Sequence, residues 1–200
     1  MTLRFTTFLI AALMLAAPAR AIDFNPFSAI KGAVEAAVED RSASDIATDT
    51  RIKAAITADV IGKLGSDVIS INSDVYEQDV MLTGAVKTQK IKDDAERLTK
   101  AVKDVKKIYN EILVIPAGAE QKGAVANLVD DSVIEGKINA LLVEAKGINA
   151  TNFRWRAVGG KVFLFGRALT KAESDKVAQV VKGIDKVIAV VNRVKIKPKG

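Results

Sequence analysis

The chain repeats itself at a constant shift of 82 residues (131 − 49), and this repeat restricts what it can fold into. Asp49 returns as Asp131, Asn110 returns as Asn192, and the run VMLTG that starts at Val80 returns as VFLFG. One register holds across polar, glycine and apolar positions without a gap. The repeat therefore predicts two copies of one small domain. Each copy is long enough to bury a modest core of its own.

A secretory signal precedes the repeat. Residues 1–7 carry one arginine and no acid, residues 8–17 are wholly apolar, and Ala19-Arg20-Ala21 places small residues at the cleavage positions. Ten apolar residues are too few to span a bilayer, so this pattern predicts a cleaved signal peptide over residues 1–21. We expect export to the periplasm and a mature chain that starts at Ile22. The chain contains no cysteine, which predicts that it is not a lipoprotein.

Composition excludes several classes of site. Without cysteine there is no disulfide framework and no thiolate metal site, and without histidine the commonest general base and metal ligand are missing. No nucleophile elbow, phosphate-binding loop or dinucleotide fingerprint occurs. Removing Arg4 and Arg20 from a net charge of +6 leaves +4, which suits anionic surfaces and also suits an ordinary soluble domain. We therefore expect no enzymatic activity, no cofactor and no metal.

Within each copy the apolar periodicity predicts the order helix, strand, strand, helix, strand. Gly159-Gly160 predicts a two-residue hairpin turn, and Thr170 with Glu173 predicts a capping box at the start of a helix. The fold class is therefore α+β, with two tandem αββαβ domains, each a three-stranded sheet that carries two helices on one face. The expected segments are a lead-in helix or linker at 22–45, a first domain at 46–116, a linker at 117–127 and a second domain at 128–197.

The recurring residues resemble a known module. An Asp-led helix, a strand of the form V-x-L-x-G and an ending with Asn192 before alternating apolar residues are similar to the BON domain, named for bacterial osmotically inducible and nodulation proteins. The second copy matches best, whereas the first has Ala101 where the family usually has glycine. A signal peptide followed by two copies resembles periplasmic dual-BON proteins linked to envelope integrity and osmotic stress. The resemblance implies a non-enzymatic module that associates with phospholipid or envelope partners.

The recurring polar residues have structural interpretations. Asn110 and Asn192 share strand parity with apolar residues, which predicts buried amides that satisfy backbone groups. Gly84 and Gly166 are expected to allow close packing of helix on sheet. Asp49, like its repeat Asp131, is expected to cap the first helix of its copy.

One face of the second sheet carries the first candidate site. With helices on one side, alternation places arginines and aromatic residues together on the other side, where copy one has no comparable basic cluster. This pattern favours an anionic phospholipid or a protein partner, and export argues against nucleic acid. The same face could instead dock on the first domain or on the lead-in helix. Its residues are Arg154, Arg156, Phe163, Phe165, Arg167, Arg193 and Lys195.

A second candidate surface lies on the first helix of copy two, which resembles the family region tied to lipid contact. It offers Val133, Leu141 and Leu142, with Val143 beside them. The leading hypothesis is an envelope-maintenance protein that binds anionic phospholipid weakly and peripherally. The alternatives are a protein-interaction or chaperone-like stress factor and, third, a hydrolase.

Overall fold

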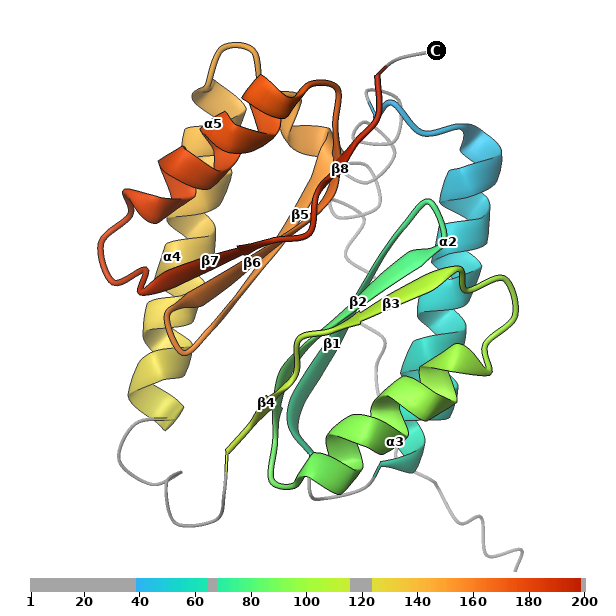
Figure 1. Cartoon of the computed structure of the whole chain (residues 1–200). Helices are drawn as coiled ribbons and strands as arrows, with labels where there is room; N and C mark the ends of the chain where they lie inside the picture. Colours follow the sequence, from blue (N-terminus) through green and yellow to red (C-terminus); the bar gives the residue numbers. More distant parts are fainter. Residues whose placement is uncertain (1–38, 65–67, 116–123, 199–200) are drawn as a thin grey trace, which may run out of the picture.

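Two domains of the same topology face each other through their sheets. The structure is a computed structural model that describes residues 39–64, 68–115 and 124–198. The predicted signal peptide lies outside the described residues, and so do residues 22–38 of the lead-in segment predicted over 22–45. Figure 1 shows the two sheets in the middle of the molecule, with the helices of each domain on the outer side of its own sheet. The predicted αββαβ order and the α+β class are confirmed.

The first domain is built from two helices and a mixed sheet. Its sheet has the order β1-β2-β3, in which β1 is antiparallel and β3 parallel to β2, while β4 also pairs with β2. The elements are α2 (Ala43–Ala55), the helical turns η1 (Ile56–Val60) and η2 (Ile61–Lys63), β1 (Val68–Tyr76), β2 (Asp79–Val86), α3 (Gln89–Lys100), β3 (Lys107–Asn110) and β4 (Leu113–Val114).

The second domain repeats this topology with the order β5-β6-β7 and with β8 paired to β6. Its elements are α4 (Ala124–Glu144), the 3-10 turn η4 (Ala150–Asn152), β5 (Phe153–Val158), β6 (Lys161–Ala168), α5 (Lys171–Lys182), β7 (Ala189–Asn192) and β8 (Lys195–Ile196). Each domain buries its own apolar core between helices and sheet, with Leu82 at the centre of one and Leu164 at the centre of the other.

The recurring aspartates hold the hairpin turns and do not cap helices, so that prediction was wrong. Asp49 lies inside α2, whose N-cap is Ser42, and its carboxylate accepts hydrogen bonds from the backbone N–H groups of Glu77 and Gln78, both at 2.7 Å. Asp131, inside α4, accepts the equivalent bonds from Gly159 and Gly160 at 2.7 and 2.8 Å. Each helix therefore fixes the β-hairpin of its own domain.

The two hairpin turns differ in how easily their residues adopt the turn. Gly159 and Gly160 have φ of 60° and 75°, as predicted for a two-residue turn. Glu77 and Gln78 adopt nearly the same positive φ, 50° and 66°, which is unfavourable for residues with a Cβ. The buried carboxylate of Asp49 stabilises this less favourable turn.

Gly84 and Gly166 serve the contact between strands, which corrects the predicted packing against a helix. Both have positive φ, 116° and 107°. A Cβ at Gly84 would overlap the carbonyl oxygen of Ser70 on the neighbouring strand, and one at Gly166 would overlap that of Asn152. Gly84 therefore allows β2 to approach β1 near the irregular point of the ladder between Val68 and Ser70, and Gly166 allows β6 to approach the residue just before β5.

The third strand of each domain is interrupted by its recurring asparagine. The Asn110 side chain accepts from the N–H of Ile112 and donates to the carbonyl oxygen of Lys92 on α3. Asn192 accepts in the same way from Val194. The amides satisfy backbone groups as predicted, but Asn110 is only half-buried and Asn192 is exposed. They break the expected continuous strand into two short ones.

Replacing Asp49 with alanine should lower the free energy of unfolding by about 2–3 kcal/mol, because buried N–H groups lose their acceptor. Asp131→Ala should cost less, since glycines adopt the turn without strain. Urea denaturation measures both, with the exposed Asp93→Ala as control. If Asp49→Ala lowered the free energy of unfolding as little as the control does, Asp49 would not hold the hairpin turn.

Candidate functional site

The basic, aromatic face predicted as the first candidate site is covered by the first domain. Phe163 and Phe165 on β6 are each 1% exposed and pack with Tyr76 and Met81 of the first sheet. The ring of Tyr109 meets that of Phe165 edge to face, with centroids 5.8 Å apart. This face is therefore an interface between the two domains, which is the alternative that the sequence left open.

Ion pairs surround this apolar contact. In each pair described here, the acid belongs to the first domain and the base to the second. Arg156 pairs with Asp74 at 3.1 Å and Arg193 pairs with Glu111 at 2.6 Å. Acids of the first domain thus meet bases of the second. Among the described residues, further pairs across the interface are Lys195 with Asp79, and Arg167 and Lys197 with Glu77.

The two domains pack about an approximate two-fold axis. Asp74 and Arg156 are 82 residues apart and so are Glu111 and Arg193, which makes each pair a contact between equivalent positions of the repeat. The strand contacts are also reciprocal, since β1 lies against β6 and β2 lies against β5. In a two-fold interface a residue near the axis faces its own equivalent, and this chain places opposite charges there.

A short segment before α2 joins both domains. The backbone N–H of Asp40 donates to the side chain of Asn152 at 2.9 Å, and the hydroxyl of Tyr76 donates to the same oxygen at 3.1 Å. Glu39 pairs with Arg154, so this candidate residue also has a carboxylate partner. Burial raises the pKa of Tyr76 well above its ordinary value, which keeps the hydroxyl protonated as a donor.

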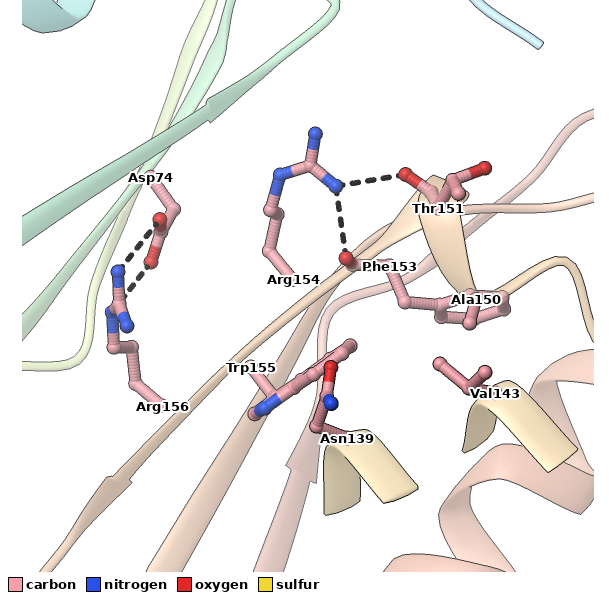
Figure 2. A pocket seen from close by; sticks show the side chains of 9 residues that line it. All are labelled: Asp74, Asn139, Val143, Ala150, Thr151, Phe153, Arg154, Trp155 and Arg156. Carbon is pink, nitrogen blue, oxygen red and sulfur yellow. Dashed lines mark hydrogen bonds and ion pairs between the residues drawn. The ribbon is translucent and has the colours of Figure 1, made fainter. Parts of the chain in front are cut away.

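A groove of about 260 Å³ lies where α4 and β5 meet the edge of the first domain. Figure 2 shows Trp155 of β5 beside Asn139 of α4, with Val143 farther along the same helix and Arg156 held by Asp74. The guanidinium of Arg154 turns back to the carbonyl oxygens of Thr151 and Phe153. Both arginines already have carboxylate partners, so neither presents an uncompensated charge to the groove.

The edge of β5 beside this groove is closed to further strand pairing at two positions. Alternation along an antiparallel edge turns the backbone groups of Phe153, Trp155 and Ala157 outward. The N–H of Ala157 donates to Glu135 of α4 at 2.9 Å, and the carbonyl oxygen of Phe153 accepts from Arg154. An added strand would therefore find the N–H of Ala157 and the carbonyl oxygen of Phe153 already bonded.

Two of the three residues predicted for the second candidate surface are exposed, and the third is buried. Val133 and Leu141 on α4 are 49% and 44% exposed, but Leu142 is fully buried in the core of its domain. The prediction for Leu142 is therefore wrong, because it shares the inner helix face with Ile138. Val143, at 66% exposed, joins the outward surface instead.

The equivalent positions of α2 are charged. Arg51 stands where α4 has Val133, and Asp59, in the turn η1, stands where it has Leu141. Both residues are exposed, and Arg51 pairs with Asp104. At the positions of Val133 and Leu141 the second domain is therefore apolar where the first is charged.

Sequence reasoning missed the acidic partners of the basic face. Strand alternation places Asp74 and Glu111 on the open side of the first sheet, where no basic cluster occurs. The opposite sign of equivalent residues was the signal for an interface. Across the described ranges, no group of histidine, cysteine, aspartate or glutamate could hold a metal ion. In the same ranges no helix has the length and apolar character needed to cross a membrane.

Two stretches of the chain match the family model of the BON domain, residues 48–116 and 130–198. These matches cover more than half of the chain and coincide with the two folded units. The chain belongs to the BON-domain family and carries the domain twice, as the resemblance in the sequence indicated.

Several known proteins are similar to this chain over most of their length. One is a 21 kDa hemolysin of Actinobacillus pleuropneumoniae, which is 29% identical in an alignment that covers 85% of this chain and 79% of the hemolysin. The osmotically-inducible protein Y of Escherichia coli is 26% identical over 76% of this chain and 73% of its own. The outer membrane lipoprotein DolP of Haemophilus influenzae is 29% identical, over 60% and 61% of the two chains. The chain is thus similar to BON-domain proteins named for osmotic induction and for the outer membrane.

Replacing Phe163 with alanine should lower the free energy of unfolding by about 3–5 kcal/mol, because it leaves a cavity between the two sheets. The matched control is Leu141→Ala, an exposed site where a change of no more than about 0.5 kcal/mol is expected. Denaturation followed by circular dichroism measures both. Equal effects of the two substitutions would show that the sheet face is exposed in solution.

Proposed function

We propose that this protein is a non-enzymatic factor of the bacterial envelope, located in the periplasm, that binds anionic phospholipid peripherally through the outward face of α4. The relatives named for osmotic induction and for the outer membrane support the envelope setting. The signal peptide predicted over residues 1–21 agrees with it.

One observation carries the choice of α4. Phe163 and Phe165 of the second sheet are buried between the domains, whereas α4 holds Val133, Leu141 and Val143 at 44–66% exposure. Burying such side chains in the interfacial region of a bilayer is favourable, at about 25 cal/mol per Å² of apolar surface. The sheet face could contact lipid only after the domains separate.

Charge on the same helix supports a preference for anionic lipid. Lys137 is exposed on α4 between Val133 and Leu141 in sequence, and in the described part of the chain it has no ion-pair partner. An exposed lysine near a membrane surface contributes about 1 kcal/mol toward anionic lipid. This contribution falls with salt, while the apolar contribution does not.

The alternative function, binding of client proteins, has less support than lipid binding, because the β5 edge beside the groove disfavours an added strand. A client that added a strand there would meet an edge whose outward groups at Phe153 and Ala157 are already bonded to Arg154 and Glu135. Such guarded edges disfavour strand addition.

Flotation with phosphatidylglycerol and phosphatidylcholine vesicles tests the proposal. Wild-type protein should float with the anionic vesicles, and Val133→Glu should weaken binding by about tenfold. Lys137→Gln should remove the anionic preference with little effect on the remaining binding. Trp155, the only tryptophan of the chain, lines the groove beside Val143 and reports binding by its fluorescence.

Ala54→Glu provides the matched control, because Ala54 is an exposed residue of α2. It should float like the wild type. Val133→Glu protein that floats like the wild type would contradict the assignment to α4. If wild type fails to float and instead suppresses aggregation of unfolded proteins, the chaperone-like alternative replaces the proposal.

A further inference from the structure

The charges at the self-facing positions of the interface decide which domains can pair. If two second domains met about the same two-fold axis, Arg156 would face Arg156 and Arg193 would face Arg193. Two first domains would bring Asp74 against Asp74 and Glu111 against Glu111. Like charges in direct contact are destabilising, so each face disfavours its own kind and favours the other.

Burial makes the first of these positions the more selective. The side chain of Asp74 is 4% exposed and that of Arg156 is 31% exposed. Asp74 also has Lys53 of its own domain at 3.6 Å, but a second carboxylate in the place of Arg156 would add repulsion at a site far from water. Glu111 and Arg193, at 17% and 43% exposure, contribute in the same direction with more screening by salt.

The remaining interface charges follow the same segregation. Glu77 and Asp79 of the first domain accept Lys197 and Lys195 of the second. Between these pairs lies the apolar contact of Tyr76, Met81 and Phe163. Every one of these contacts is satisfied equally well by the complementary domain of another molecule. Separated domains would expose an apolar face that is unfavourable in water.

We propose that the two sheet faces also pair between molecules, so that the first domain of one chain docks on the second domain of a second copy. The result is a reciprocal dimer with two heterotypic interfaces, formed when the domains of each chain separate. The self-facing charges exclude pairing of like with like. The partner of this surface is a second copy of this chain.

Two full-length variants test the proposal. Arg156→Glu with Arg193→Glu makes the self-facing positions of both faces acidic, and Asp74→Lys with Glu111→Lys makes them basic on both faces. Each variant alone should be a monomer with a larger hydrodynamic radius than wild type, because its own faces repel. Mixed at equal concentration, the two should form a one-to-one dimer in light scattering coupled to size exclusion, and high salt should weaken it.

Controls with the same change of net charge reverse exposed residues away from the interface. Lys90→Glu with Lys171→Glu is the control for the acidic variant. Asp59→Lys with Asp175→Lys is the control for the basic variant. The mixed controls should stay monomeric. A mixture of interface variants that stays monomeric would overturn the proposal, as would self-association of either variant as strong as that of the mixture.

A second measurement uses wild-type protein, in case the variants do not fold. Refolding from denaturant at high concentration should trap a dimer fraction that grows with protein concentration, and refolding at low concentration should give monomer. A monomer at every concentration would overturn the proposal.

Discussion

The packing of one sheet on the other is the contact on which the rest of the molecule depends. Phe163 and Phe165 find their apolar environment in the first domain, because their own domain places its helices on the opposite side of the sheet. Without this contact, a row of aromatic and basic side chains would face water. The interface therefore determines which surfaces of the protein stay exposed. The sheet faces are buried in it, whereas the outward face of α4 remains exposed.

The repeat explains both the similarity and the difference between the domains. Positions that hold each fold together are the same in both copies, as with Asp49 and Asp131 at the hairpins or Gly84 and Gly166 between strands. Positions on the shared face differ in sign, as with Asp74 and Arg156. The first set is needed for the fold of each domain. The second set reflects one pairing, in which each face needs its complement.

Most of the fold could be predicted from the sequence, because hydrophobic periodicity and turn residues act locally. The αββαβ order, the Gly159-Gly160 turn and the Thr170 cap are confirmed. The role of Asp49 could not be predicted in this way, since its partners are 28 and 29 residues away and the helix begins earlier, at Ala43. Leu142 was misplaced because three adjacent apolar residues do not indicate which one points inward.

What covers the basic face of the second sheet could not be predicted by considering each domain separately. Strand parity placed Arg156 and Phe163 correctly on the side away from the helices, but parity does not say what covers that side. The complementary acids were visible on the first sheet, and only the two-fold relation between the copies brings Asp74 to Arg156.

Zero-length cross-linking of the unmodified protein with a carbodiimide tests the sheet-to-sheet packing most directly. The reagent joins a lysine to a carboxylate in contact, and Lys195–Asp79 at 2.6 Å and Lys197–Glu77 at 2.8 Å both span the interface. We predict that mass spectrometry of the monomer band finds both links at low protein concentration. Links confined to pairs within one domain, such as Lys186–Asp130 and Lys90–Asp94, would contradict the packing.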